Sequence, residues 1–306
     1  MQITFLGTGG GLPSPLRGVS ALAVQVGRDV VLFDCGEGTQ RQFMLSSVSF
    51  MKVSVVFITH FHGDHFLGLP GLIQSMSFSG REKELHLYGP EGMIELVQRI
   101  LSLGYFEPGY PILVGEMKGG ERLDLDTFTV MAVSSEHTVP GLSFVLEEKP
   151  RRGRFLADRA RELGVREGPL FSKLQSGKSV VVDGRTVEPS EVMGPPRAGR
   201  KIVLSGDTRP TDALIEAARG ADVLIHEATL DSSLAEGAKE YGHSTAREAA
   251  EVAARAEVGQ LVLTHISNRY GDAKVLEEEA KESFPNTLLA HDLMTMTVRL
   301  RDRPLT

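Results

Sequence analysis

The sequence predicts an α/β protein with two β-sheets packed face to face and helices on both outer surfaces, a four-layer αββα sandwich. Two observations predict this fold. First, short segments rich in β-branched residues alternate with helical segments in each half of the chain, which favours sheets faced by helices. Second, histidine and aspartate residues follow several of these strands. We expect one domain over residues 1–306, with an inserted, flexible basic arm at about 149–200.

The N-terminal half supplies the first series of strands and helices. A glycine-rich loop at residues 7–13 lacks the lysine of a nucleotide-binding P-loop, so it is weak evidence for phosphate binding. Strands, recognised by β-branched and apolar residues, are expected at residues 2–6, 20–26, 30–33, 53–59, 84–88, 112–114, 126–132 and 142–147. Helices are expected at residues 40–45, 67–78 and 89–102.

The C-terminal half repeats the alternation. Strands are expected at residues 201–205, 222–225 and 260–263, with two short strands at the end of the chain, and helices at 210–219, 246–256 and 272–283. The helix at 246–256 has a predicted N-cap at Ser244 or Thr245, with Glu248 positioned to complete a capping box.

The segment between Lys149 and Lys201 departs from this alternation and is basic. It contains 13 of the 33 Lys and Arg residues but only 6 of the 40 Asp and Glu residues, in a chain of net charge −7. A helix at 155–163, a turn at Gly168-Pro169, a short helix at 170–174 and a hairpin around Asp183-Gly184 are expected. Its apolar periodicity is too low for a full core, so we expect a projecting insertion. It is either an ordinary solvated surface or an arm for a polyanion.

Composition indicates a cytoplasmic protein. Cys35 is the only cysteine and cannot form an internal disulfide; a lone cysteine after a strand is most often a small core residue. No apolar run has the length of a membrane helix, and the first residues lack the basic-then-apolar pattern of a signal peptide. We therefore expect no membrane association.

The densest group of candidate functional residues follows the strand at 53–59. Three histidines and an aspartate lie within six residues, in the order His60, His62, Asp64, His65. On an extended loop His60 and His62 point to the same side and can share a metal ion, whereas Asp64 and His65 turn to the other side and can hold a second. Neutral imidazole and carboxylate are ligands of catalytic zinc. A merely solvated loop would not predict matching ligands elsewhere in the chain.

This H-x-H-x-D-H pattern resembles the signature of the metallo-β-lactamase fold, which agrees with the predicted sandwich. Three other strand ends carry ligand-type residues, and together they complete two metal sites. We assign His60, His62 and His137 to one zinc ion, Asp64, His65 and His265 to the other, and Asp207 as a bridge between them. Two such ions clamp the attacking and leaving oxygens of a phosphodiester, and Asp64 is also a candidate general base.

Further polar residues have weaker signals. Asp34 either caps a helix or orients a ligand histidine through its second ring nitrogen, and we favour the second role. His243 precedes a predicted helix and is either a surface residue or a proton donor close to Glu227. His86 is interpreted as structural, His226 as structural or supporting, and His291 is given no role.

With these residues in view, the chain resembles the ribonuclease Z (tRNase Z) family in its short form. The resemblance covers nearly the whole length. It implies a homodimeric, metal-dependent endoribonuclease with two zinc ions per subunit, which cuts precursor tRNA on the 3′ side of the discriminator base and leaves a 3′-hydroxyl. It also implies that Glu227 and His243 act as a pair beside the metals. The motifs that carry it are Thr59-His60-Phe61-His62-Gly63-Asp64-His65, Ser205-Gly206-Asp207-Thr208-Arg209, His226-Glu227-Ala228-Thr229, His243-Ser244-Thr245 and Leu263-Thr264-His265-Ile266-Ser267.

The resemblance also implies that the basic arm grips tRNA, because the family has an arm with a Gly-Pro turn. Lys and Arg contacts to phosphate are independent of sequence. Where many relatives have Pro-x-Lys-x-Arg-Asn, this chain has Pro15 and Gly18 in place of the Lys and Asn. The resemblance therefore does not settle whether this protein rejects RNA whose 3′ end already carries CCA. The expected RNA contacts are Arg17, Arg269, Arg151, Arg152, Arg154, Gly168, Pro169 and Lys173.

Two other functions compete with this one. A small-molecule phosphodiesterase or related hydrolase of the same superfamily would use the same metal site but would not need a basic arm. A non-enzymatic RNA-binding protein would need the arm but not a full set of metal ligands. DNA is not expected as a partner.

Overall fold

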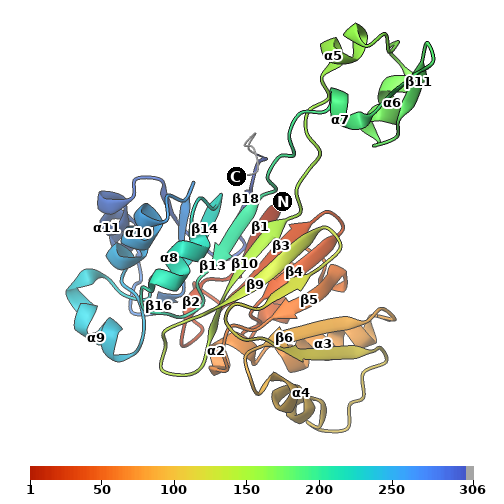
Figure 1. Cartoon of the computed structure of the whole chain (residues 1–306). Coiled ribbons are helices and arrows are strands. Elements are labelled where there is room, and N and C mark those ends of the chain that lie inside the picture. The colour runs from red at the N-terminus through yellow and green to blue at the C-terminus, as the bar shows by residue number, and fades with distance from the viewer. Residues whose placement is uncertain (301–306) are drawn as a thin grey trace. The chain divides into compact units, whose positions relative to one another are not determined.

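The structure is a computed structural model that describes residues 1–300. It contains two compact units, the larger formed by Met1–Glu147 with Arg200–Arg299, and the smaller containing Glu148–Gly199. Figure 1 labels the elements of both. Within the described residues, no helix has the length and apolar character needed to cross a membrane.

The larger unit contains two seven-stranded sheets, the first in the order β18-β1-β3-β4-β5-β6-β7. The strands from β18 to β4 pair antiparallel, and those from β4 to β7 pair parallel. Runs of valine, leucine and phenylalanine suit strands that are covered on both faces. The bounds are β1 (Gln2–Gly7), β3 (Ala21–Val26), β4 (Asp29–Phe33), β5 (Val53–Phe57), β6 (Leu85–Gly89), β7 (Ile112–Glu116) and β18 (Thr295–Thr297).

The second sheet has the order β17-β15-β14-β13-β10-β9-β8. Its strands β13, β14, β15 and β17 are parallel, whereas β10 pairs antiparallel with β13. Parallel strands present their carboxyl ends at one edge of the sheet, where ligands bind in open α/β folds. The bounds are β8 (Arg122–Asp124), β9 (Phe128–Ser134), β10 (Leu142–Glu148), β13 (Lys201–Leu204), β14 (Val223–Glu227), β15 (Leu261–Thr264) and β17 (Thr287–Leu289).

Three apolar clusters separate four layers and confirm the predicted αββα sandwich. Between the sheets, the rings of Phe33, Phe57 and Phe144 lie 5.2–5.8 Å apart. A second cluster lies between the first sheet and its helices, and a third between the second sheet and its helices. The helices on the first sheet are α1 (Thr39–Leu45), α3 (Leu69–Phe78) and α4 (Met93–Leu101). Those on the second, visible together in Figure 1, are α8 (Asp212–Ala218), α10 (Ala246–Arg255) and α11 (Lys274–Ser283).

The histidine loop differs from its predicted form. Residues 60–62 form no regular element, with an extended backbone at His62, and Gly63–Phe66 form the short helix α2. A helix predicted to begin at residue 67 begins instead at Leu69, in α3. Between the two helices, a Cβ on Gly68 would lie 2.1 Å from the carbonyl oxygen of Gly36. This close backbone contact accounts for glycine at the junction.

Several short elements have no counterpart in the prediction. The two-residue strand β2 (Gly9–Gly10) pairs parallel with β16 (Ile266–Ser267), so the glycine-rich loop lies against the chain that follows β15. The expected strand at 126–132 is shifted to β9, and β8 precedes it. The others are η1 (Phe50–Lys52), η2 (Ser232–Leu234) and α9 (Ala235–Glu240).

The smaller unit has a small hydrophobic core of its own, although its apolar periodicity was predicted to be too low for a full core. The predicted hairpin is present, and its turn residues Asp183 and Gly184 both have positive φ. Each short element gives the core only one or two side chains, so no periodic pattern marks them. The elements are α5 (Ala157–Glu162), α6 (Pro169–Gln175), β11 (Val180–Val182), β12 (Arg185–Val187) and α7 (Pro189–Val192). The buried residues are Ala160, Val165, Leu174, Val180, Val187 and Val192.

Candidate metal centre

Seven predicted ligands from four segments of the larger unit meet at one place. The segments are the loop and short helix after β5, the loop between β9 and β10, the loop after β13, and the junction of β15 and β16. Three groups of side chains each have ligand atoms within 4.8 Å of one another. The first is His60, His62, His137 and Asp207, the second is Asp64, His65 and His265, and a third joins Asp207 and His265 to His243. The first two groups contain the residues that the sequence assigned to the two ions, whereas His243 was not predicted to be a ligand.

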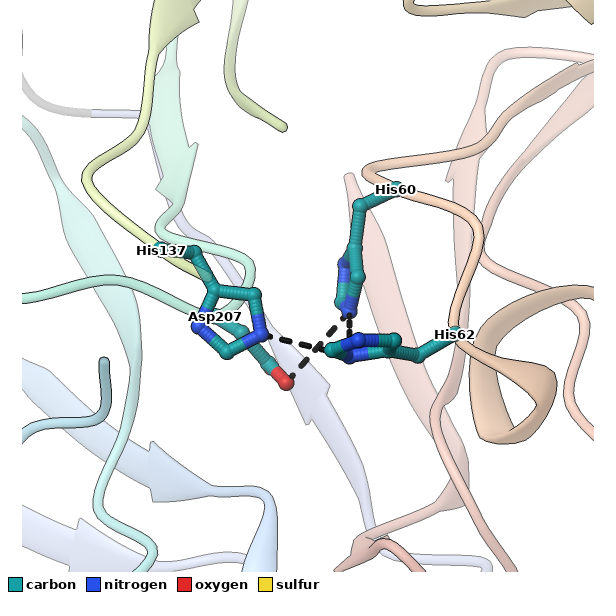
Figure 2. A group of neighbouring side chains, drawn as sticks. All are labelled: His60, His62, His137 and Asp207. Atoms are coloured by element: carbon teal, nitrogen blue, oxygen red, sulfur yellow. Dashed lines mark hydrogen bonds and ion pairs between the residues drawn. The ribbon is translucent and has the colours of Figure 1, made fainter. Parts of the chain in front are cut away.

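The first group converges from three segments, and Figure 2 shows its four side chains pointing toward one another. His62 Nδ1 lies 3.0 Å from His60 Nε2 and 3.2 Å from His137 Nε2. His60 Nε2 lies 3.6 Å from Asp207 Oδ2. Tetrahedral ligands at the usual zinc distances of about 2.0–2.1 Å are separated from one another by about 3.3 Å. The spacing therefore fits a single ion.

The second group has similar spacing, and two of its side chains also contact Asp207 of the first group. His265 Nε2 lies 3.3 Å from His65 Nε2, 3.4 Å from Asp64 Oδ2 and 3.2 Å from Asp207 Oδ2. Asp207 Oδ2 is also 3.3 Å from His65 Nε2. One carboxylate oxygen thus borders both groups, which fits a bridging ligand.

Hydrogen bonds on the outer side of the rings aim nitrogen lone pairs into the site. His137 Nδ1 donates to the carbonyl oxygen of Gly242 at 2.8 Å, and His65 Nδ1 donates to Asp34 Oδ2 at 2.8 Å. A ring that donates from Nδ1 keeps an acceptor lone pair on Nε2 when it is neutral. Lone pairs that face one another at these distances repel unless a cation or a proton lies between them. The donor set therefore fits a metal site.

The charges of the buried side chains also indicate a metal site. Burial opposes ionisation of Asp207, but His265 and His65 hold its pKa well below the usual value. Burial would lower the pKa of His65, yet Asp207 and Asp34 raise it well above the usual value. Burial, together with the neighbouring His65, holds the pKa of His60 well below the usual value, so this ring stays neutral. These carboxylates need positive charge beside them, from a proton on His65 or from bound cations.

Asp34 has the role that we favoured. Its Oδ1 accepts from the backbone nitrogen of Thr59 at 2.7 Å, in addition to the contact of Oδ2 with His65. The N-cap of α1 is Gly38, not Asp34. Asp34 has a φ of +56°, a conformation that is uncommon outside glycine and that clusters at functional sites.

The glycine-rich loop supports the ligands from the side of β2. The backbone nitrogen of Gly11 donates to Asp64 Oδ2 at 2.7 Å. A Cβ on Gly10 would lie 2.4 Å from the ring of His265, so glycine is needed there for the imidazole to fit. Asp292 holds the loop by accepting from Thr8 Oγ1 at 2.7 Å.

Glu227 and His243 form the predicted pair beside the ligands. His243 Nδ1 donates to Glu227 Oε1 at 3.0 Å and lies 3.9 Å from Asp207 Oδ2. The ring of His243 is 5.0 Å from that of His137 and 5.3 Å from that of His265. Burial would lower the pKa of His243, but the charge and hydrogen bond of Glu227 raise it to about 9. The imidazole can therefore hold a proton at neutral pH.

A salt bridge that the sequence did not predict holds three of the site loops together. Arg209 directly follows the loop of Asp207, and its guanidinium binds both carboxylate oxygens of Glu248 and donates to the carbonyl oxygen of His243. Its backbone nitrogen donates to the carbonyl oxygen of Glu136, next to His137, at 2.8 Å. Glu248 also completes the predicted capping box of α10 with Thr245.

This salt bridge predicts a pH-dependent loss of stability. Burial would raise the pKa of Glu248, but Arg209 and the backbone of Thr245 lower it. A lowered pKa contributes stability above the unfolded value of about 4.3, and this contribution is lost as the pH falls through the folded value. Glu248→Gln should therefore lower the free energy of unfolding by about 1–3 kcal/mol at pH 7, and by less below about pH 4.

Urea unfolding of the metal-free proteins at both pH values measures this difference. Glu107→Gln is the matched control, because Glu107 is exposed on a loop of the larger unit. The interpretation is wrong if Glu248→Gln costs as much at acid pH as at neutral pH.

A cleft of about 510 Å³ adjoins the metal ligands and places one predicted RNA contact beside them. Arg269 lines this cleft with His62, His137, His243 and His265. Tyr241 and Leu12 also line it and are largely exposed. The sequence analysis did not identify these two residues, because single exposed apolar residues have no pattern. An exposed aromatic ring in such a cleft can stack on a nucleobase.

The other predicted RNA contacts belong to the loop before β3 and to the smaller unit. Arg17 donates to Thr8 Oγ1 at 2.6 Å and to the carbonyl oxygen of Ala290 at 2.7 Å, so its guanidinium holds the glycine-rich loop. In the smaller unit, Arg151, Arg152 and Arg154 line a hollow of about 540 Å³ with Arg197. The remaining three, Gly168, Pro169 and Lys173, are exposed at the start and middle of α6.

The remaining histidines lie outside the ligand groups. His86 Nε2 contacts Glu84 Oε1 at 2.8 Å on the surface, in agreement with a structural role. His226 is fully buried, and its Nδ1 donates to the carbonyl oxygen of Glu227 at 2.7 Å, so it fixes the end of β14. His291 is exposed.

An αββα sandwich with two adjoining groups of histidine and aspartate ligands defines a metal-dependent hydrolase of the β-lactamase superfamily. Family models agree: residues 192–266 match the β-lactamase superfamily domain, and residues 1–140 match the anti-Pycsar protein Apyc1. The curated relatives are more specific. The chain is 48% identical over 302 residues to Ribonuclease Z of Methanothermobacter thermautotrophicus, covering 99% of this chain and 98% of the relative. It is also 48% identical to Ribonuclease Z of Methanosarcina acetivorans, covering 98% and 99%.

Among solved structures, human tRNase Z, short form, matches with a TM-score of 0.73 and 30% identity, covering 98% of this chain and 100% of that one. The chain belongs to the ribonuclease Z family. The resemblance inferred from the sequence motifs is therefore confirmed.

Proposed function

We propose that the protein is a zinc-dependent endoribonuclease that processes the 3′ end of tRNA. It hydrolyses the phosphodiester on the 3′ side of the discriminator base of precursor tRNA and leaves a 3′-hydroxyl. The observation that carries this proposal is the pairing of Glu227 with His243 beside two adjoining groups of metal ligands, in a chain 48% identical over its length to proteins named Ribonuclease Z. No observation favours the alternative of a small-molecule hydrolase.

The site is proposed to hold two zinc ions per subunit. His60, His62 and His137 would bind one, Asp64, His65 and His265 the other, and Asp207 both. Histidine-rich ligation favours zinc over magnesium. Bound there, zinc would neutralise charge on the phosphodiester and acidify the attacking water.

The protein's own residues would supply the proton transfers. Asp64 is ionised, because hydrogen bonds with His265 and His65 lower its pKa against the effect of burial. Its carboxylate would accept a hydrogen bond from the attacking water and serve as general base. His243, oriented by Glu227, would donate a proton to the leaving 3′ oxygen. The cleft beside them, with Arg269 in its wall, would receive the RNA around the scissile bond.

The smaller unit is proposed to be the arm that binds tRNA, with Arg151, Arg152, Arg154, Lys173 and the Gly168-Pro169 turn as contacts. Basic side chains that bind phosphates serve many tRNAs equally, because they do not read bases. We propose that the protein is a homodimer, as the resemblance to the family implies. We also propose that it acts in the cytoplasm and has no DNA partner.

Paired precursor tRNAs, one encoding CCA and one lacking it, test the proposed function. The zinc-loaded protein should cut both types or only the second, and mapping of the 3′ ends shows which. Pro15 and Gly18 stand in the loop that is linked to sensing of CCA in many relatives. Whether the precursor that encodes CCA is cut is therefore the informative result. Absence of cleavage in both substrates would contradict the proposal, provided that bound zinc is verified.

His65→Ala should remove one of the two zinc ions. His65 Nε2 lies within 3.3–3.5 Å of His265, Asp64 and Asp207, so its loss opens the second group. Elemental analysis after dialysis should show about one zinc per chain in place of two. His86→Ala, on the surface, should keep both. Two zinc ions retained by the His65 variant would contradict the assignment.

A further inference from the structure

Glu227 contacts more than His243, because its two carboxylate oxygens point to different partners. Oε1 accepts from His243 Nδ1 and from the backbone nitrogen of Thr208, each at 3.0 Å. Oε2 accepts from Thr229 Oγ1 at 2.7 Å and from the backbone nitrogen of Thr229 at 3.3 Å. The side chain is 1% exposed, so these contacts replace its hydration.

The direction of each hydrogen bond follows from what each group can donate. An ionised carboxylate only accepts, and a hydroxyl has a single proton. The Thr229 hydroxyl donates that proton to Glu227. Its oxygen, 2.8 Å from His265 Nδ1, can then only accept. His265 therefore carries a proton on Nδ1 and, when neutral, presents the Nε2 lone pair to Asp64, His65 and Asp207.

We propose that Thr229 is a positioning residue that fixes the tautomer and orientation of His265 through Glu227, so that one carboxylate orients both the proton donor and a ligand of the second metal. This inference rests on the two-metal site proposed above. Other contacts restrict His265 as well: its φ is +57° and its ring lies against Gly10. They set where the ring lies, whereas Thr229 sets which nitrogen carries the proton.

A second set of contacts in the site has the same arrangement, which supports the proposal. Thr59 Oγ1 lies 3.0 Å from Asp34 Oδ2 and 3.0 Å from His60 Nδ1. Asp34 contacts His65 directly, as Glu227 contacts His243. In both arrangements a carboxylate thus orients one histidine directly and another through a threonine hydroxyl. Partners of this kind typically change metal affinity by 10–100-fold.

We call the hydrogen bonds that run from Glu227 through the Thr229 hydroxyl to His265 the relay. Thr229→Val and Thr229→Ser test it in the full-length, zinc-loaded protein. Valine has the shape of threonine without the hydroxyl, and serine keeps the hydroxyl. On titration with a chelating dye, one of the two zinc ions of Thr229→Val should dissociate about 10–100-fold more readily than in the wild type. Thr229→Ser should resemble the wild type. The absorption spectrum of the cobalt-substituted protein should change at one site in the valine variant only. Thr297→Val, at an exposed position of β18, is the matched control.

Two further variants distinguish the relay from the proton donor. Glu227→Gln should weaken retention of the same zinc ion, because the amide cannot accept at both positions as a carboxylate does. His243→Ala should leave zinc retention unchanged. The proposal is overturned if Thr229→Val retains both ions with wild-type affinity, or if Thr229→Ser loses one as readily as Thr229→Val does.

The zinc measurements need no RNA, so the outcome is separate from that of the proposed function. A wild type that binds two zinc ions but cuts no precursor tRNA would contradict the proposed function and leave the relay to be decided by zinc retention. A wild type that binds no zinc would overturn the two-metal site and the relay together.

Discussion

Replacing His243 with alanine should slow cleavage of precursor tRNA by about 10²–10⁴-fold, the usual contribution of a general acid, while both zinc ions stay bound. His243 contacts Glu227 at 3.0 Å and is not part of either principal ligand group. With its pKa raised to about 9, the wild-type imidazole is a ready proton donor at neutral pH. Bound cations oppose that charge, so the pKa of the loaded enzyme should lie lower. Single-turnover cleavage at matched zinc content measures the loss.

The structure also brings His243 within 3.9 Å of Asp207, so zinc content must be measured in the same samples. His86→Ala is the control for loss of a histidine from the larger unit. Unchanged turnover in the His243 variant would remove this residue from the mechanism. A slower reaction accompanied by loss of zinc would instead make His243 a metal ligand, in line with its proximity to Asp207 and His265.

The sequence predicted that these side chains converge, because their types and order are restrictive. His60, His62, Asp64 and His65 are adjacent in the chain, so their grouping depends only on the local backbone. That backbone was predicted in part: His60 and His62 do face one ion site, but Asp64 and His65 reach the other from the helical turn α2, not from an extended loop. A turn of four residues is too short to have a periodic signal.

Most of the contacts that orient the ligands could not be predicted from the sequence. Asp34 was a candidate because metal-bound histidines need a second partner, but the salt bridge between Arg209 and Glu248 joins residues 39 apart in sequence. No periodic pattern or motif spacing marks such a pair. Thr229 belongs to a motif that was recognised, yet only the folded structure shows that its hydroxyl lies between Glu227 and His265.

The core of the smaller unit could not be predicted from the sequence either. The basic composition and the hairpin at Asp183-Gly184 were visible in the sequence. The core was not, because its buried residues come singly from short elements. The core of the smaller unit therefore determines which residues a deletion of the arm must include. Excision of residues 151–178 alone would strand the buried Val180, Val187 and Val192, whose packing partners Ala160, Val165 and Leu174 would be gone.

Removal of the whole smaller unit should abolish precursor tRNA cleavage and spare hydrolysis of a small chromogenic phosphodiester. Strands β10 and β13 pair antiparallel, with Glu147 opposite Lys201. An Asn-Gly turn in place of residues 148–200 would therefore join them as a two-residue hairpin. The metal ligands and the three cores of the larger unit lie outside the deleted segment. At limiting RNA concentration we expect a loss of at least about 100-fold, with a weaker dependence on salt, because phosphate contacts are lost.

Point variants separate the charge of the arm from its bulk. Neutralising Arg152, Arg154 and Lys173 with alanine should weaken RNA cleavage, mainly through KM, and should flatten its salt dependence in proportion to the phosphate contacts removed. The matched control neutralises Lys83, Lys118 and Lys239, three exposed lysines of the larger unit. Because both triple variants remove the same charge, a long-range effect of net charge would affect them equally, whereas a binding arm would affect only the first. Equal loss of RNA and chromogenic activity after removal of the arm, with the fold and zinc content intact, would contradict the arm's proposed role.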